Sequence, residues 1–298
     1  MNSKNDYILC FGEVLWDRLP TGAKPGGAPM NVALHLRAAG LNVSFASCVG
    51  QDEPGDRLRD FLQNSGLKTN LIQVDKTLPT SEVLVKLDEN RNASYEICEP
   101  VAWDNISLDN SLLQEAQNSG LLVYGSLASR NKTTRETLLQ LLETDATKLI
   151  DVNLRAPFDK QEVVELLLSK SDIVKLNDDE LDIIARWYNL STKDEEQKVK
   201  WMVKQYGIKM LCVTKGANGA LLCSDNEFFH HPGYKVHTID TVGAGDAFLS
   251  GLITALLKKQ SPGSALNLAC ATGAFVASKA GATPKYNWQE IQEIINQK

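Results

Sequence analysis

The strongest constraint on the fold is an alternation of short apolar runs with longer amphipathic stretches along most of the chain. The apolar runs have the length of strands, and the stretches between them carry apolar residues at helical spacing. This alternation predicts an α/β fold, in which helices cover both faces of a mainly parallel sheet. We expect strands at residues 7–11, 43–48, 121–124, 149–152, 172–176 and 210–214. We expect helices at residues 29–39, 56–64, 108–118, 133–143, 160–169, 178–188, 194–205, 246–258, 263–279 and 287–296.

One segment departs from this alternation. From Thr80 to Glu99, apolar and polar residues alternate on both sides of a turn at residues 89–92, which indicates an antiparallel hairpin. A lone hairpin cannot bury its apolar face, and residues 13–20 also read as extended. We therefore expect one domain over residues 1–298, with a small antiparallel lid formed by residues 13–20 and 80–99. The lid would close over a ligand and offers an edge for pairing with a second subunit, as a homodimer.

Charge and composition exclude several classes of partner. The chain has 37 Asp and Glu against 31 Lys and Arg, a formal charge of -6, and no basic block, which disfavours nucleic acid and anionic membranes as partners. No apolar run approaches the ~18 residues of a membrane span, and the polar start MNSKND lacks the core of a signal peptide. We expect a cytoplasmic protein with free cysteines. The cysteine and histidine spacings argue against a zinc site.

The most informative motif is Asp-Thr-Val-Gly-Ala-Gly-Asp-Ala-Phe at residues 240–248, which precedes an apolar helical stretch. Gly243 and Gly245 permit a tight turn, and the amides of residues 243–246 then open a helix, which makes an anion site. An isolated Asp246 would be interpreted as a simple helix cap. The chain lacks a P-loop motif and the third small residue of a dinucleotide fingerprint. A P-loop enzyme and a nicotinamide-dependent oxidoreductase are therefore disfavoured.

Two separated motifs resemble the signatures of ribokinase-like (PfkB) carbohydrate kinases. Residues 240–246 match the C-terminal signature, and Gly-Gly-Ala-Pro-x-Asn-Val-Ala at residues 26–33 matches the N-terminal one. The resemblance runs from about residue 7 to residue 284. Within the family, the chain is most similar to bacterial fructokinases, through Gly12-Glu13-x-Leu15-x-Asp17, Ala102-Trp103-Asp104 and residues 125–128.

The resemblance implies phosphoryl transfer from ATP to a ketohexose, with fructose phosphorylated at its 6-hydroxyl. Another ketose, a keto sugar acid or a nucleoside are alternative acceptors, and a non-catalytic sugar-binding protein is a further alternative. The family also implies a role for each matching residue. Asp246 would be the base, at an anion hole formed by Gly243, Ala244 and Gly245, and Arg155 would contact the sugar or the transferring phosphate. The sugar would be bound by Asp17, Gly26, Gly27, Asn31 and Trp103. We also expect the helix dipole to keep Asp246 ionised at neutral pH.

Several of these residues have simpler interpretations. Asp17 could start a turn, Asn31 could lie in the first turn of a helix begun by Pro29, and Arg155 could form a surface ion pair.

For the nucleotide and the metal, the family implies Mg²⁺ and phosphate binding near Lys175, Asn177 and Glu180. However, Asn177 and Glu180 also have the spacing of a capping box.

Thr214, Gly216 and Gly219 resemble the family's nucleotide loop, although a hairpin turn would use the same glycines. Cys270 stands where many relatives have Asn, in a run of small residues expected to wall the adenine. Asp240 would help to bind a monovalent cation such as K⁺, or it would only end a strand.

Overall fold

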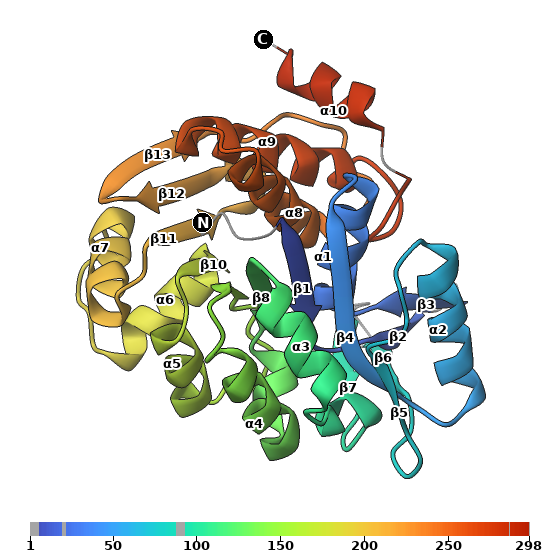
Figure 1. The fold of residues 1–298 in the computed structure, drawn as a ribbon. Coiled ribbons are helices and arrows are strands. Elements are labelled where there is room, and N and C mark those ends of the chain that lie inside the picture. Colours follow the sequence, from blue (N-terminus) through green and yellow to red (C-terminus); the bar gives the residue numbers. More distant parts are fainter. Residues whose placement is uncertain (1–5, 20–21, 88–92, 286, 298) are drawn as a thin grey trace.

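The computed structural model describes residues 6–19, 22–87, 93–285 and 287–297. Its centre is a nine-stranded sheet in the order β13-β12-β11-β10-β9-β8-β1-β4-β5 (Figure 1). All neighbouring strands from β11 to β5 are parallel, whereas β12 is antiparallel to both β11 and β13. The strands are β1 (Tyr7–Phe11), β4 (Asn42–Gly50), β5 (Ile72–Asp75), β8 (Leu121–Gly125), β9 (Thr147–Asp151), β10 (Ile173–Asn177), β11 (Met210–Thr214), β12 (Ala220–Ser224) and β13 (Glu227–His231).

Helices cover both faces of the sheet because its strands are apolar on both sides. In β1, Ile8 and Cys10 join one buried cluster, while Leu9 and Phe11 join another. The helices of the first cluster are α1 (Ala28–Ala38), α2 (Glu53–Asn64), α8 (Ala244–Leu257), α9 (Pro262–Ala277) and α10 (Trp288–Ile295). Those of the second are α3 (Asn110–Asn118), α4 (Lys132–Leu141), α5 (Gln161–Ser169), α6 (Asp178–Trp187) and α7 (Glu195–Tyr206), with the short 3₁₀ helices η1 (Ala102–Asn105) and η2 (Leu127–Arg130).

A second sheet, which we call the lid, projects from one side of the domain (Figure 1). Its strand order is β3-β2-β6-β7, and its strands are β2 (Leu15–Leu19), β3 (Gly22–Gly26), β6 (Ser81–Leu87) and β7 (Ala93–Ile97). β6 and β7 are antiparallel with Val83 opposite Ile97, and β2 is parallel to β6 and antiparallel to β3. The predicted small second sheet is therefore confirmed, but it is mixed rather than wholly antiparallel, because β2 runs parallel to β6. The turn at residues 89–92 lies outside the described residues.

All predicted helices and strands are present, with ends shifted by a few residues. Four strands lie outside the predicted ranges: β3, β5, β12 and β13. β3 reads Gly-Ala-Lys-Pro-Gly, a composition that disfavours a strand, and it forms because β2 supplies a partner along its whole length.

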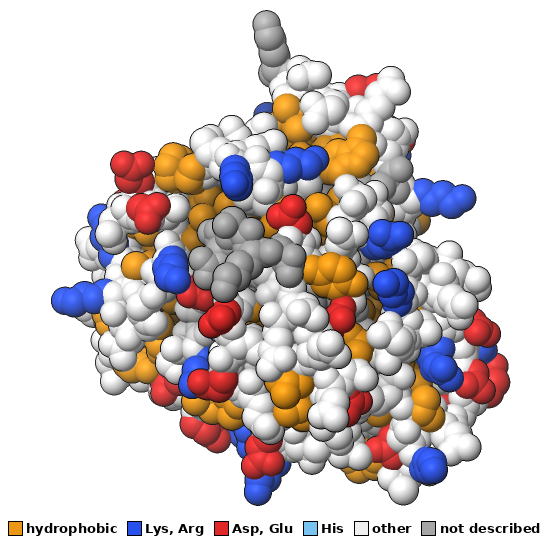
Figure 2. Space-filling model, in the orientation of Figure 1, with side chains coloured by type: hydrophobic (Ala, Val, Ile, Leu, Met, Phe, Trp, Pro, Cys, Tyr) orange, Lys and Arg blue, Asp and Glu red, His pale blue; other side chains and the backbone are white. Residues whose placement is uncertain are grey.

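Among the described residues, no helix is long and apolar enough to cross a membrane. Figure 2 shows acidic and basic side chains interspersed on one face of the molecule.

Candidate active site

Polar side chains gather where the parallel strands end. Glu13 follows β1 by two residues, Asp151 ends β9, Asn177 ends β10 and Thr214 ends β11. Because these strands are parallel neighbours or near neighbours, their carboxyl ends meet at one edge of the sheet. Ligands of open α/β sheets bind at this edge.

The turn before α8 is shaped by Gly243. This residue is the N-cap of α8 with φ 76°, and a Cβ placed on it would lie 2.6 Å from the carbonyl oxygen of Ala282. The Ala244 amide donates to Thr241 within the turn. The amides of Gly245 and Asp246 lie in the first helical turn, where no intrahelical acceptor exists. Of the amides predicted to form the anion hole, those of Gly245 and Asp246 thus lie at a helix N-terminus, whereas the Ala244 amide is already engaged.

Asn31 holds the carboxylate of Asp246. The Asn31 Nδ2 donates to Asp246 Oδ2 over 2.8 Å, which connects α1 to α8. The backbone enters α1 at Gly27, where φ is 117° and a Cβ would lie 2.5 Å from the Glu13 carbonyl oxygen. Asn31 is 6% exposed, and its Oδ1 has no hydrogen-bond partner among the described residues. The fold thus brings Asn31 and Asp246, two predicted site residues 215 positions apart in the chain, into direct contact.

The protonation of Asp246 differs from our expectation. Burial, together with the nearby charge of Asp151, raises its pKa to about 7. The Asn31 hydrogen bond, Lys175 and Arg155 act in the opposite direction but do not compensate. This pKa does not support the expectation that Asp246 is fully ionised at neutral pH, because burial and the charge of Asp151 outweigh the stabilisation by Asn31, Lys175 and Arg155.

A buried ion pair lies beside this turn. Lys175 Nζ donates to both carboxylate oxygens of Asp151 over 2.9 Å, and Lys175 is only 7% exposed. A Cβ on Gly245 would lie 3.3 Å from Lys175 Nζ, so the ammonium packs directly against the anion hole. Burial acts to lower the pKa of Lys175, but the carboxylates of Asp151 and Glu180 raise it overall. The ammonium therefore stays charged beside the turn at Gly243–Asp246.

Sequence reasoning missed two residues of this site, Asp151 and Glu13. Asp151 was visible only as the polar residue that ends an apolar run. Glu13 is 2% exposed, and its Oε2 has no hydrogen-bond partner among the described residues. Burial raises the pKa of Glu13 to about 7, while amide hydrogen bonds, including one from Ala28, and the charge of Arg155 oppose that rise. Both residues followed strands, which was the available signal.

The predicted sugar residues of the lid lie close together. A Cβ on Gly26 would lie 2.2 Å from Asp17 Oδ2, so the carboxylate of β2 rests on the glycine backbone of β3. Burial raises the pKa of the half-buried Asp17, and the charge of Arg155 opposes that rise. Arg155 is exposed, in the loop after β9, and its charge also acts on Glu13 and Asp246. The Arg155 Nη1 donates to the Leu154 carbonyl over 3.0 Å, and its charge acts on the carboxyls of Asp17, Glu13 and Asp246 from a distance.

The placement of Trp103 differs from that of the other predicted sugar-binding residues. Its side chain is fully buried, and the Arg130 guanidinium carbon lies 4.0 Å from its ring centroid. The indole therefore belongs to the core in this structure, and the predicted sugar contact by Trp103 has no support from its placement.

Asn177 and Glu180 form the capping box of α6. The Asn177 side chain accepts from the Glu180 amide, and Glu180 Oε2 accepts from the Asn177 amide over 2.9 Å. Glu180 Oε1 accepts from the Leu154 amide over 2.8 Å, so this carboxylate also holds the loop that carries Arg155. Within the described parts of the chain, no group of three His, Cys, Asp or Glu side chains could hold a metal ion by itself. The oxygen donors present suit a hydrated Mg²⁺ that is also bound by phosphate.

The predicted nucleotide loop connects the antiparallel strands β11 and β12, as a hairpin turn would. Gly219 has φ 82°, and a Cβ there would lie 1.9 Å from the His231 carbonyl oxygen, so glycine is required. Gly216 begins a short 3₁₀ turn with φ 53°, and Thr214 donates to the Leu176 carbonyl over 3.4 Å. These contacts explain the glycines without a ligand.

Cys270 and Asp240 occupy different environments. Cys270 is buried in α9, and burial raises the pKa of its thiol to about 12, so it offers an uncharged apolar surface.

Asp240 accepts from the Val242 amide and from the Gly281 amide, each over 3.0 Å. It therefore ties the turn before α8 to the loop after α9.

Comparisons with known proteins agree with this geometry. Residues 7–289 match the model of the pfkB family carbohydrate kinases. The chain is 28% identical to a fructokinase of Salmonella typhimurium over 97% of this chain and 98% of the relative. It is 28% identical to an aminoimidazole riboside kinase of the same species, over 85% of this chain and 76% of the relative.

A solved structure of a fructokinase from Vibrio cholerae, with fructose, ADP and calcium bound, has a TM-score of 0.82 and 25% identity. The alignment covers 98% of this chain and 99% of that one. The family match extends across both sheets and the Gly243–Asp246 turn, and it decides against the oxidoreductase alternative. The chain belongs to the pfkB family of carbohydrate kinases.

Proposed function

We propose that this protein is a fructokinase that transfers the γ-phosphate of ATP to the 6-hydroxyl of fructose. The observation that carries the proposal is the Asn31–Asp246 contact at the start of α8. The contact joins α1, which follows β3 of the lid, to the first turn of α8, and the carboxyl that it holds has a pKa of about 7. Such a carboxyl suits a base that orients a hydroxyl and accepts its proton late in phosphoryl transfer.

Each side of this carboxyl has a role in the proposal. On the lid side, Asp17 would accept hydroxyls of the sugar, with Gly26 and Gly27 allowing its close approach and Asn31 Oδ1 accepting a further hydroxyl. On the other side, the Gly245 and Asp246 amides and Lys175 would meet the phosphate. Arg155 would balance charge on the transferring group.

ATP and Mg²⁺ are the proposed cofactors, and K⁺ is a proposed activator near Asp240. Asn177 and Glu180 would hold the hydrated Mg²⁺, which neutralises charge on the phosphates when bound. Thr214, Gly216, Gly219 and the wall that includes Cys270 would bind the nucleotide. We further propose a cytoplasmic location and pairing of two subunits through the lid.

A nucleoside kinase is the second candidate, supported by the likeness to the aminoimidazole riboside kinase. The fructokinase relative is matched over more of both chains, and this favours the ketohexose.

A coupled assay of ADP release tests the two candidates over a panel of D-fructose, other ketohexoses, keto sugar acids, ribose and nucleosides. Fructose should give the highest kcat/KM in the presence of Mg²⁺. Turnover of nucleosides without turnover of fructose would refute the fructokinase proposal and support the second candidate.

The alternative of a non-catalytic sugar-binding protein is tested with Asp246→Asn, which should lose about 10²- to 10⁴-fold in kcat while still binding sugar. The exposed Asp145→Asn serves as the matched control and should retain full activity. Sugar binding without any ADP release in the wild-type protein would support the binding-protein alternative.

A further inference from the structure

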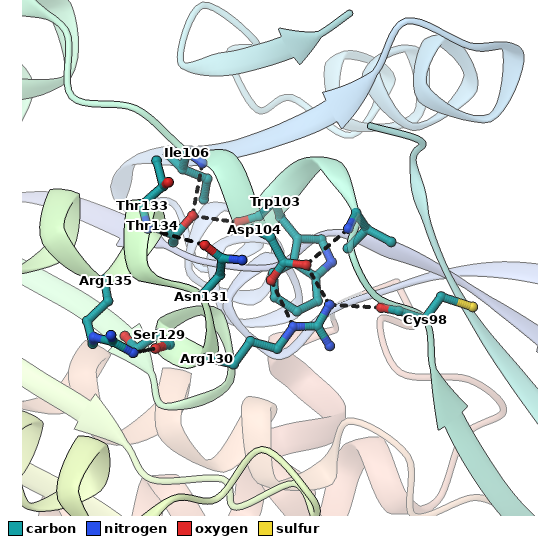
Figure 3. Close-up of polar contacts among 11 residues, drawn as sticks. Cys98, Trp103, Asp104, Ile106, Ser129, Arg130, Asn131, Thr133, Thr134 and Arg135 are labelled. Atoms are coloured by element: carbon teal, nitrogen blue, oxygen red, sulfur yellow. Dashed lines mark hydrogen bonds and ion pairs between the residues drawn. The ribbon is translucent and has the colours of Figure 1, made fainter. Parts of the chain in front are cut away.

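Arg130 is a buried cation outside the site described above, at the end of η2 (Figure 3). Its side chain is 4% exposed. Its Nε and Nη2 donate to the two carboxylate oxygens of Asp104, each over 2.8 Å. A bidentate pair of this kind fixes the plane of the guanidinium as well as its position. A buried ion pair by itself adds little stability, so its geometric consequences are of interest.

The first consequence concerns the lid. Arg130 Nη2 also donates to the carbonyl oxygen of Cys98 over 2.8 Å, and Cys98 is the residue that follows β7 (Figure 3). Asp104 Oδ2 accepts from the Val101 amide over 3.0 Å. The Arg130–Asp104 pair therefore holds the segment through which the chain leaves the lid.

The second consequence concerns the loop that carries Arg155. The Arg130 guanidinium carbon lies 4.4 Å from the ring centroid of Phe158. The Phe158 amide donates to the Arg155 carbonyl over 2.7 Å and closes the turn that contains Arg155. A flat guanidinium stacked on an aromatic ring fixes the position of that ring more strongly than an ammonium would. One side chain therefore contacts both the exit of the lid and the Arg155 loop.

The entry to the lid has a separate anchor. Asp52, the N-cap of α2, accepts from the Thr80 amide and the Thr80 hydroxyl just before β6. The hydrogen bonds described for the Asp52 side chain are to Gly55 and Thr80, and none of them reaches the Arg155 loop. Asp52 and Arg130 thus hold the two ends of the same hairpin, and of these two anchors Arg130 is the one that contacts the Arg155 loop.

We propose that Arg130 is a positioning residue that fixes the lid exit and the Arg155 loop in one arrangement. Lid closure over the sugar then leaves Arg155 facing the acceptor. The inference rests on the proposed kinase function for Arg155. It predicts that the contribution of Arg155 to catalysis depends on Arg130 and does not depend on Asp52.

The test is a double-mutant cycle with Arg130→Lys and Arg155→Met, assayed by ADP release. Arg130→Lys keeps the charge but loses the bidentate, stacked geometry. We expect it to lower kcat/KM for the sugar about tenfold with little change in KM for ATP. We also expect Arg155→Met to have a much smaller effect in the Arg130→Lys background than in the wild type. Equal effects of Arg155→Met in both backgrounds would overturn the proposal.

Two controls separate positioning from general destabilisation. Asp52→Asn should change sugar kinetics but leave the effect of Arg155→Met unaltered, and coupling of similar size there would contradict the proposal. The neighbouring Arg135→Met removes only the hydrogen bond to the Ser129 carbonyl and should be neutral. If Arg130→Lys does not fold, Phe158→Leu tests the same link, since it leaves the Arg130–Asp104 pair in place and should also reduce the effect of Arg155→Met.

Hydrogen exchange of the free protein gives a readout that does not require turnover. Arg130→Lys should accelerate exchange in residues 97–102 and in residues 152–158, whereas Asp52→Asn should accelerate it only near Thr80. Faster exchange at the lid exit alone would overturn the proposed coupling even in an active kinase. Coupled exchange in a protein that phosphorylates no sugar would place the failure in the proposed function instead.

Discussion

The raised pKa of Asp246 predicts a specific dependence of the rate on pH. With a pKa of about 7 in the free protein, about one tenth of the molecules have an ionised Asp246 at pH 6, and about nine tenths at pH 8. A base acts only in its ionised form, so kcat/KM for the sugar should rise about tenfold between these pH values. If Asp246 kept its usual pKa of 3.8, the two rates would be nearly equal.

The assay measures ADP release at subsaturating sugar between pH 5.5 and 8.5, at constant ionic strength and with excess coupling enzymes. This condition reports the pKa of the free enzyme. Asn31→Ala provides an internal check, because the Asn31 hydrogen bond lowers the pKa of Asp246 and its loss should move the midpoint to higher pH. A level kcat/KM across this range, or an unchanged midpoint in Asn31→Ala, would refute the assignment of Asp246 as a buried base.

Three further predictions address stability and ion dependence. Burial raises the pKa of Glu13 from 4.5 to about 7, so the contribution of this carboxyl to stability is fully present below pH 4.5 and falls by up to about 3 kcal/mol as pH rises to 7. Glu13→Gln should remove this loss, and urea unfolding that shows equal stabilities of variant and wild type at pH 8 would contradict it. Gly243→Ala should destabilise the protein by about 2 to 4 kcal/mol in thermal unfolding and lower kcat, because the new Cβ would meet Ala282. The control Gly207→Ala has φ 68° and open space around it, so it should cost only about 1 kcal/mol. Equal costs of the two substitutions would show that the contact with Ala282 is unimportant. Replacing potassium by tetramethylammonium at equal ionic strength should lower kcat if Asp240 helps to bind a cation, and an unchanged kcat and KM for ATP would show that Asp240 only ties the two loops together.

The helices and most strands could be predicted because their signals are local. Each helix carries its apolar residues at a spacing that is visible in one short window, and many begin at a capping residue, as α6 does at Asn177. β3 had no such signal, because Pro25 and its glycines disfavour a strand. It is a strand only because β2 lies beside it.

The residues of the candidate site also fall into two groups, those with a local sequence signal and those without one. The Gly243–Asp246 turn could be recognised from sequence because its glycines and its carboxylate are adjacent in the chain. Asp151 and Glu13 could not be recognised, since an acidic residue after a strand becomes part of a site only when other strands bring Lys175 and Arg155 near it. Trp103 was misplaced for the converse reason, because its burial under Arg130 depends on a segment 27 positions away.

The sequence by itself determined the order of the helices and of most strands, the lid hairpin, the family and the identity of the candidate base, because each is visible in short local patterns of the chain. Tertiary structure alone decided the charge state of Asp246. Its pKa depends on how much water the packing of α1 and α8 removes and on the distance to Asp151 and Lys175, and neither quantity is encoded in a local pattern. The same reason explains why the connection from the lid through Arg130 to the Arg155 loop became visible only in the folded chain.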